Sequence, residues 1–276
     1  MFKQQLTKTI VGLLTIAILG TSCADNFEKI RRSNNVKEKM TNAFKYYQKG
    51  ECDKAQFLFE DILPLVKGDT IGEKVYFTYA NTHFCQKNYN FASYYFKQFF
   101  ITYPNSDLAE EALYMAAYSN YMLSPTYRLD QTYTEKAIEG MQLFANTYPQ
   151  SKRIPECNKL VDQMRRVQEE KAYESANLYF KMKDYKSAVY SFQSLLQDYP
   201  DTENTEKINY MIIRSNYHLA LNSILSKAIE RLNETIKFYQ NFVDTYPKSK
   251  YLTEAQEIFS SCVTILEKIK KASERK

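Results

Sequence analysis

A four-position signature that returns five times along the 276 residues constrains the fold of this chain more than any other feature. Each copy begins with a small residue, followed four positions later by an aromatic residue or methionine and seven positions later by a large apolar residue. Positions four and seven apart lie on one face of an α-helix, so each copy predicts a helix with one apolar stripe. The copies are Ala55, Phe59 and Ile62; Ala92, Phe96 and Phe99; Ala137, Met141 and Phe144; Ala188, Phe192 and Leu195; and Thr235, Tyr239 and Phe242.

A helix stop follows each copy, twelve positions after its small residue. In the first copy the helix is predicted to end at Lys67, just before Gly68. In the other four the stop is a proline, which cannot continue a helix interior. Each proline follows a tyrosine and precedes, two positions later, a serine or threonine such as Ser106, which we expect to cap the next helix. The prolines are Pro104, Pro149, Pro200 and Pro247.

A partner helix is predicted ahead of each striped helix. A second small residue lies twelve positions before three of the copies. These residues are Ala43, Ala80 and Ala176. Ala117 takes this place in the third copy at a distance of 20, and Ile213 in the fifth at a distance of 22. The third pair of helices therefore has an insertion between its members, over residues 124–131.

The pattern resembles the second helix of the tetratricopeptide repeat, whose small, aromatic, apolar and proline positions have these offsets. We therefore predict an all-α fold, a tetratricopeptide-repeat superhelix of about five helical pairs followed by a capping helix over Leu252–Lys270. Such repeats build their core by stacking on their neighbours, so no single pair is expected to fold alone.

The link between the third and fourth pairs is longer than the others. Ile154–Met182 contains no glycine, one proline near its start at Pro155, and many strong helix formers. One helix of roughly 40 Å is predicted here. We expect residues 36–153 to hold the first three pairs, and residues 154–276 to hold the long helix, the last two pairs and the capping helix.

The N-terminus has the pattern of an export signal. Lys3 and Lys8 precede an uncharged, mostly apolar run, Ile10–Leu19. As a helix this run would rise only about 15 Å, half the hydrocarbon thickness of a bilayer, so it predicts a signal-peptide core and no membrane span.

Small residues lead from this run into Cys23, an arrangement that resembles the lipobox of bacterial lipoproteins. In those proteins the cysteine becomes the lipidated first residue of the mature chain. We expect a signal peptide over residues 1–22, lipidation at Cys23 and a linker over residues 23–35. Ordinary signal-peptide cleavage after Ala24 is the alternative.

Composition argues against several classes of function. Removal of the leader with its two lysines leaves 35 basic side chains against 32 acidic ones, too even and too dispersed for nucleic-acid binding. Only two histidines are present, so the sequence offers few residues for acid–base catalysis or a catalytic triad. The six glycines are scattered singly, so no glycine-rich phosphate-binding loop is predicted. We predict no catalytic residue, no metal, no cofactor and no small-molecule substrate.

The four cysteines after Cys23 show no paired close spacing. His83 is the only histidine near any of them, so a zinc site is not expected. An exported protein can form a disulfide, but the spacing does not indicate whether one forms or which pair it would join. These cysteines are Cys52, Cys85, Cys157 and Cys262.

The order of elements and two groups of residues resemble the BamD family. Members of that family are outer-membrane lipoproteins of the periplasmic face, which partner the barrel protein BamA in folding and inserting β-barrel proteins. The resemblance implies the same location and role here, as a non-catalytic scaffold that binds a BamA-type barrel protein and unfolded outer-membrane proteins. The first group contains Tyr95 to Phe99, Tyr103 to Ser106 and Glu110 to Tyr114. The second group is Tyr118 to Pro125 with Arg128, Asp130, Gln131 and Thr132.

The resemblance also implies where partners bind. In such repeats the first helix of each pair lines the concave surface, where aromatic side chains offer a large contact area at low conformational cost. Ordinary packing between helices is the alternative for each of these residues. The predicted substrate-peptide groove comprises Phe44, Tyr47, Phe77, Phe84, Tyr114, Tyr118 and Tyr121. Family analogy places the BamA contact in the C-terminal pairs, at Arg214, Tyr217 and His218.

Three other classes of function are less favoured by the sequence. A different periplasmic repeat lipoprotein, scaffolding cell-envelope complexes, would share the leader and the helical pairs but lack the insertion over residues 124–131 and the long link. A glycan-capturing lipoprotein of the SusD type would use tryptophan platforms, and this chain has no tryptophan. An enzyme is the least favoured class.

Overall fold

The structure, a computed structural model, describes residues 27–66 and 70–274. Within these ranges all regular structure is helical, which confirms the all-α prediction. Residues 27–32 are helical. The later elements are α2 (Val36–Gln48), α3 (Cys52–Ile62), η1 (Leu63–Leu65), α4 (Thr70–Cys85), α5 (Tyr89–Thr102), α6 (Ala109–Leu123), α7 (Thr132–Thr147), α8 (Ile154–Lys181), α9 (Tyr185–Asp198), α10 (Thr205–Leu221), α11 (Leu225–Thr245) and α12 (Leu252–Ser273).

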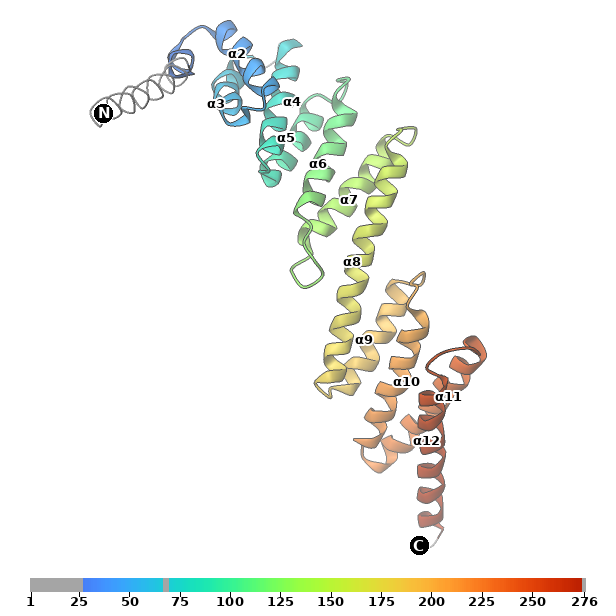
Figure 1. Ribbon diagram of the computed structural model, residues 1–276. Helices are drawn as coiled ribbons and strands as arrows, with labels where there is room; N and C mark the ends of the chain where they lie inside the picture. The colour runs from blue at the N-terminus through green and yellow to red at the C-terminus, as the bar shows by residue number, and fades with distance from the viewer. Residues whose placement is uncertain (1–26, 67–69, 275–276) are drawn as a thin grey trace, which may run out of the picture. The chain divides into compact units, whose positions relative to one another are not determined.

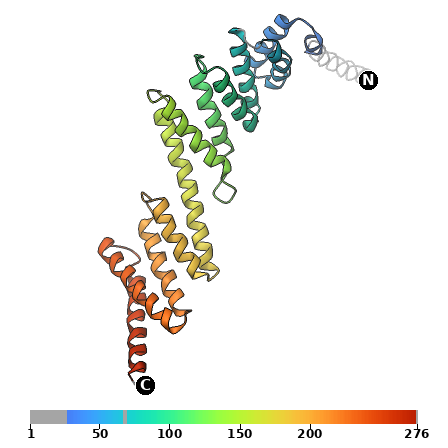
Figure 2. The same ribbon diagram turned by 180° about the vertical axis from the view of Figure 1, so that it is seen from behind.

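The chain forms two compact units, and the long helix α8 contributes to both. The N-terminal unit runs to Pro125 and resumes over residues 130–164, and the C-terminal unit comprises residues 126–129 and 165–276. Within each unit, consecutive helices run antiparallel and lie side by side, as both views show (Figures 1 and 2). The single long helix agrees with the prediction for Ile154–Met182, and α12 extends three residues beyond the expected capping helix.

The residues of the repeated signature form the core. The small, aromatic or methionine, and large apolar residues of the five copies, fifteen in all, are buried except Tyr239. Tyr239 is half-buried and stacks on Phe259 of the last helix with ring centroids 4.7 Å apart. The partner residues, including Ala117, are buried too. A side chain on Gly140 of α7 would place its Cβ 2.8 Å from the Cβ of Ala117 on α6, so these helices approach closely only because both residues are small.

The predicted stops are confirmed for four of the five striped helices. Helices α5, α7, α9 and α11 each end two residues before their proline. The first prediction is wrong, because α3 ends at Ile62 and a 3-10 turn that contains Pro64 follows. The sequence signal was Pro64 itself, since the ring of a proline interrupts the α-helix. Lys67 lies outside the described residues.

The serines and threonines after the Tyr-Pro pairs do not cap the next helices, contrary to expectation. Helix α6 has Leu108 at its N-cap without a side-chain bond, and the hydroxyl of Ser106 accepts from the Leu108 N–H at 3.3 Å. In the later repeats the hydroxyl also donates to a glutamate on an earlier helix, which connects neighbouring repeats. The pairs are Ser151 with Glu110 at 2.6 Å, Thr202 with Glu169, and Ser249 with Glu206 at 2.5 Å.

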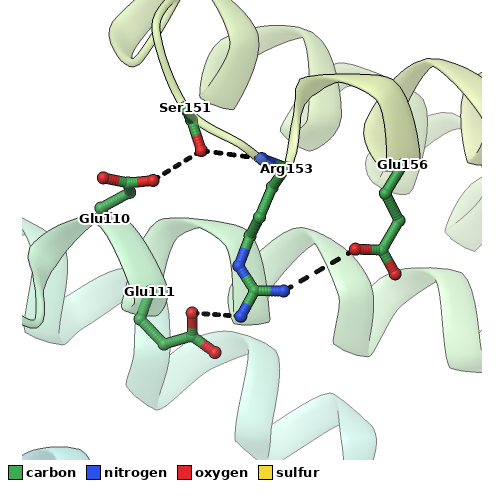
Figure 3. A network of polar contacts seen from close by, with 5 residues as sticks. All are labelled: Glu110, Glu111, Ser151, Arg153 and Glu156. Atoms are coloured by element: carbon green, nitrogen blue, oxygen red, sulfur yellow. Dashed lines mark hydrogen bonds and ion pairs between the residues drawn. The ribbon is translucent and has the colours of Figure 1, made fainter.

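Figure 3 shows the most extended of these bridges. Ser151 Oγ accepts from the Arg153 N–H at 3.1 Å while it donates to Glu110. The Arg153 guanidinium donates to Glu111 at 2.5 Å and lies 3.7 Å from Glu156. Within the N-terminal unit, this network holds the start of α6 against the start of α8.

A disulfide joins Cys52 at the start of α3 to Cys85 at the end of α4, across 33 residues. The sequence left this pairing open, and the geometry of the first two helical pairs decides it. Cys157 and Cys262 are buried free thiols. A disulfide suits an exported protein, because oxidising compartments preserve such bonds.

The insertion between α6 and α7 is secured to the long helix. Lys171 Nζ donates to the carbonyl oxygens of Leu129 at 2.7 Å and Tyr127 at 3.3 Å. Both carbonyls and Lys171 belong to the C-terminal unit. Among the helices that the structure describes, none is both long enough and apolar enough to cross a membrane.

Candidate protein-binding surfaces

The first surface is a hollow of about 510 Å³ between α2 and α4, which we call the N-terminal pocket. It contains two predicted groove residues, Phe44 and Tyr47, on one face of α2 because they are three positions apart. Phe44 packs edge-on against Phe59 at 5.1 Å between ring centroids, and Lys74 Nζ lies 5.3 Å from the centre of the Phe44 ring. The lining residues are Thr41, Phe44, Lys45, Tyr47, Gln48, Lys74 and Thr78.

Partial burial affects the Tyr47 hydroxyl in this pocket. Desolvation raises the pKa of Tyr47, so the phenol stays neutral and can donate a hydrogen bond at physiological pH. The side chain is half-buried. Tyr47 therefore presents both an apolar ring and a polar tip to the pocket.

The second surface is an aromatic ladder formed by Phe84 of α4 and three tyrosines of α6. Tyr118 is its centre, with ring centroids 6.0 Å from Phe84, 5.6 Å from Tyr114 and 5.7 Å from Tyr121. The tyrosines share one face of α6 because they are separated by four and three positions. Tyr118 lies nearly parallel to Tyr114, at 14° between ring planes, and at 27° to Tyr121.

The members of the ladder differ in access to solvent. Tyr114 is only 3% exposed, and the Arg153 guanidinium lies 4.2 Å from its ring centre. Burial and the nearby Glu156 raise the pKa of Tyr114. Phe84, Tyr118 and Tyr121 are half-buried, so they retain surface for a ligand. Tyr114 therefore packs against Tyr118 as a buried member of the ladder and offers little surface to a ligand.

Phe77, the remaining predicted groove residue, is half-buried between the helices of the second repeat. Its ring packs edge-on against Phe96 and Phe99, at 5.5 Å from each. Most of its contacts are therefore with the core. Sequence spacing did not separate Phe77 and Tyr114 from the more accessible aromatics, because all of them occupy equivalent repeat positions.

The third surface is a pocket of about 250 Å³ between α10 and α12 in the C-terminal unit, the C-terminal pocket. It brings together all three predicted partner-binding residues, Arg214, Tyr217 and His218. Arg214 lies 5.0 Å from the Phe180 ring centre, and His218 stacks on Tyr185 at 5.0 Å. The lining residues are Tyr210, Arg214, Tyr217, His218, Glu254, Glu257, Ile258 and Ser261.

The electrostatics of this pocket set it apart from the N-terminal one. Burial and the adjacent Arg214 lower the pKa of His218, which keeps it neutral at pH 7. Burial and a hydrogen bond to Glu254 raise the pKa of Tyr210 to about 12. Glu254 and Glu257 of α12 line the same pocket as Arg214. The sequence prediction did not include these glutamates, although their spacing of three places them on one face of the capping helix.

Among the residues that the structure describes, no group of three or more histidine, cysteine, aspartate or glutamate side chains is arranged to hold a metal ion. The predicted lipidation site, Cys23, lies outside the described residues.

Two solved structures of repeat proteins show limited similarity to the chain. The TPR2AB domain of yeast Sti1 in its pHSP90 complex is 12% identical, with a TM-score of 0.40 over 83% of this chain and 98% of that one. A thermophilic tetratricopeptide-repeat protein of Thermus thermophilus is 16% identical, with a TM-score of 0.33 over 83% of this chain and all of that one. Because both scores are low, the fold assignment depends on the helices themselves.

Sequence comparison identifies the family. Residues 32–232 match the YfiO family, described as outer membrane lipoprotein. The putative outer membrane protein assembly factor BamD of Aquifex aeolicus strain VF5 is 24% identical over 212 residues, which cover 76% of this chain and 68% of that protein. The family match includes the N-terminal unit from residue 32 and most of the C-terminal unit. The chain therefore belongs to the YfiO family of outer membrane lipoproteins, the BamD family that its motifs resemble.

Proposed function

We propose that this protein is a non-catalytic scaffold for the assembly of outer-membrane β-barrel proteins. In this proposal the N-terminal unit binds unfolded barrel proteins and the C-terminal unit binds a BamA-type barrel protein. Family membership and the name of the Aquifex relative, a putative assembly factor, support the role. The observation that carries the proposal is the half-buried aromatic surface of Phe84, Tyr118 and Tyr121 in the N-terminal unit.

The chemistry of this aromatic surface suits a barrel strand before it folds. Lipid-facing positions of such strands alternate with lumen-facing ones, and aromatic residues gather where the strand meets the membrane interface. An extended segment can stack its aromatic side chains on the ladder while its polar side chains point to water. The Tyr121 hydroxyl donates to Gln163 at 3.3 Å, which holds the outer ring of the ladder in place.

Attachment to the membrane is the second part of the proposal. Lipidation of Cys23 would anchor the mature chain to the outer membrane on its periplasmic face. The Cys52–Cys85 disulfide supports an oxidising location such as the periplasm. Radiolabelled palmitate should label the native chain and leave a Cys23→Ser variant unlabelled. An unlabelled native chain would remove this part of the proposal.

Depletion of the protein in cells tests the role as a whole. Loss of many outer-membrane barrel proteins at once, measured by quantitative proteomics of isolated envelopes, is the expected result. Unchanged barrel levels, with a defect in another envelope complex, would indicate the alternative of a different periplasmic repeat scaffold.

Peptide binding tests the aromatic surface. Tyr118→Ala with Tyr121→Ala should weaken binding of a fluorescent barrel-strand peptide by about 10-fold or more, because truncation of aromatic anchors commonly costs about 1–2 kcal/mol or more. Tyr94→Ala with Tyr190→Ala is the matched control, since both tyrosines are exposed and lie outside the ladder. Equal losses in the two variants would contradict a specific surface.

Crosslinking tests the partner contact. A photoreactive amino acid at Tyr217, in the C-terminal pocket, should form adducts with a copurified barrel protein. The same probe at Tyr94 of the N-terminal unit should not. If neither position crosslinks while the complex still copurifies, the partner binds elsewhere.

A further inference from the structure

Two exposed arginines and an exposed aromatic ring lie close to the predicted lipid anchor. We infer that this surface, formed by Arg31, Arg32 and Phe57, docks on the zwitterionic phospholipid headgroups of a bilayer. We call these three residues the anchor-side surface. The inference rests on the part of the proposed function that attaches Cys23 to the outer membrane, and it adds which face of the first repeat lies against that membrane.

The chain between the anchor and the first repeat is short. Phe27, four positions after Cys23, packs edge-on against Tyr46 of α2 at 5.7 Å between ring centroids, and Ile30 is only 5% exposed. Four residues of fully extended chain span at most about 14 Å. Lipidated Cys23 would have its acyl chains in the hydrocarbon. Phe27, and with it the repeat against which it packs, must then lie within about 14 Å of the bilayer interface.

The packing of the helix that begins at Phe27 determines which of its side chains remain free to face the membrane. Phe27 and Ile30 are three positions apart on one face, and both pack with the core of the first repeat. Arg31 and Arg32 stay outside, with 53% and 83% of their side chains exposed. Arg31 Cζ lies 5.8 Å from the ring centre of Phe57 on α3, and Phe57 is itself 53% exposed.

The arginines provide the polar part of a headgroup contact. A guanidinium group has five N–H donors in a planar fork that matches the oxygens of a phosphate. Glu28 lies 3.3 Å from Arg31 and 3.7 Å from Arg32, so two guanidinium groups share one carboxylate. One carboxylate has too few oxygens to accept from all of these donors, which leaves donors for lipid phosphates.

Phe57 provides the apolar part. Aromatic side chains gather where a membrane meets water, with the ring toward the acyl chains. Of the exposed aromatic side chains in the described part of the chain, Phe57 is the one with a cation over its ring. Because the phosphates of a bilayer lie just outside its acyl region, the ring and the Arg31 guanidinium can reach these two regions together.

Carboxylates near Phe57 indicate the kind of headgroup. Asp53, Glu60 and Asp61 are exposed on α3, within about one turn of Phe57. Glu60 already accepts hydrogen bonds, and Asp61 pairs with Lys39 at 2.7 Å. The first repeat therefore presents charges of both signs beside the ring. A zwitterionic headgroup, with one phosphate and one ammonium group, matches this mixture better than a purely anionic one.

Fluorescence tests the contact directly, because the chain has no tryptophan and one substitution provides a single fluorophore. The full lipidated chain with Phe57→Trp is reconstituted into vesicles of phosphatidylethanolamine and phosphatidylcholine. Bromination of the phosphatidylcholine acyl chains, which quenches nearby tryptophan, should lower the emission about 2-fold, since interfacial apolar side chains lie about 5–10 Å into the headgroup and acyl boundary. Leu143→Trp is the matched control on α7 of the third repeat, where Leu143 is 48% exposed, and its emission should stay unchanged.

A second pair of variants tests the arginines in the Phe57→Trp chain. Arg31→Gln with Arg32→Gln should lower the quenching toward that of the Leu143→Trp chain, because the contacts to phosphate are lost. Lys97→Gln with Lys159→Gln removes the same charge from exposed positions of the N-terminal unit and should keep the quenching. Circular dichroism verifies that the arginine variant is folded. The comparison of Phe57→Trp with Leu143→Trp needs no arginine variant and stands if that variant does not fold.

Flotation of the vesicles separates this inference from the proposed anchor. If the native chain does not float with them, the anchoring part of the proposed function fails and the inference fails with it. If the chain floats but Phe57→Trp is not quenched, the inference is overturned and the anchor stands. Equal quenching of Leu143→Trp, or full quenching in the arginine variant, overturns the inference as well. Quenching that requires added phosphatidylglycerol overturns the assignment to zwitterionic headgroups.

Discussion

The two units are built from the same helical pairs, yet they present different surfaces. The N-terminal unit combines an aromatic ladder with a pocket lined by Phe44, Tyr47 and two lysines, and a disulfide joins two of its helices. In the C-terminal unit, one arginine and two glutamates line the pocket, and Cys262 is a buried free thiol. The repeated signature determines what is buried and leaves the exposed face free to diverge. One fold can therefore present two binding surfaces with different chemistry.

Removal of the disulfide should produce the largest difference between the units. Cys52→Ser with Cys85→Ser releases a loop of 33 residues from its crosslink, and such a loss costs roughly 3 kcal/mol. Hydrogen exchange should accelerate in α3 and α4 and stay unchanged in α10 and α11. Cys262→Ala in the C-terminal unit is the control. Equal acceleration in both units would show that they unfold together.

A side chain at Gly140 should be the next most damaging change. Gly140→Val forces atoms into the Ala117 contact, and overpacking of this kind costs about 1–3 kcal/mol. Urea unfolding followed by hydrogen exchange should place the loss at α6 and α7. Gly140→Val combined with Ala117→Gly should recover part of it. An unchanged unfolding midpoint for the single variant would contradict the close approach.

Acid should destabilise the N-terminal unit more than the C-terminal one. His83 is 4% exposed, stacks on Tyr95 at 4.9 Å, and neither ring nitrogen has a hydrogen-bond partner among the described residues. Burial lowers the pKa of His83 below its ordinary 6.5, with Glu60 as a smaller opposing influence. The unfolded chain therefore binds the proton more readily, so stability is lost as the pH falls below about 6.5, by at most ~1.4 kcal/mol per pH unit.

This acid sensitivity can be separated from other titrations by substitution. His83→Phe should flatten the decline in stability of α4 and α5 between about pH 7 and pH 5, measured by urea unfolding at each pH. His218→Phe should have the smaller effect, because His218 is only half-buried, although burial and Arg214 lower its pKa too. An identical pH profile for native chain and His83 variant would rule out His83 as the cause.

The smallest effect is expected at the insertion. Lys171→Ala removes two hydrogen bonds to the carbonyls of Tyr127 and Leu129, which should cost about 1 kcal/mol or less because these contacts are partly exposed. Hydrogen exchange of residues 126–130 should accelerate while the helices of both units keep their protection. Lys171→Arg, which retains donors, should show less acceleration. Unchanged exchange in both variants would mean that the loop is held by other contacts.

Most of the fold was predictable because apolar residues that recur at helical spacing are the residues that become buried. Ala92, Phe96 and Phe99 are fully buried, as their spacing predicts. The role of Ser106 at the start of the next helix was not predictable in this way. A hydroxyl that follows a proline turn can bond the next helix or an earlier one, and only the position of the earlier glutamate decides between them. The same applies to the bridges of the later repeats, whose partners lie 33 to 43 residues away.

The candidate sites were predictable only in part, for a related reason. Equivalent repeat positions placed Phe77, Tyr114 and Tyr118 in one predicted groove, but burial separates them: Tyr114 is covered by Arg153, and Phe77 packs into its own repeat. The sequence did not predict that Lys45 and Lys74 line a pocket, because isolated lysines are common on exposed helices. The position of Lys74 over the Phe44 ring depends on how α2 and α4 pack, which the sequence pattern does not indicate.

By itself, the sequence determined the helical pairs, their ends at four prolines and the long link, because each follows from spacing along the chain. Only the tertiary structure decided the Cys52–Cys85 pairing, the bridges between repeats and which aromatics remain accessible. These features depend on distances between residues far apart in sequence. Such distances are set by how the helices pack. Periodicity along one helix indicates which of its faces is buried, but not which other helices pack against that face.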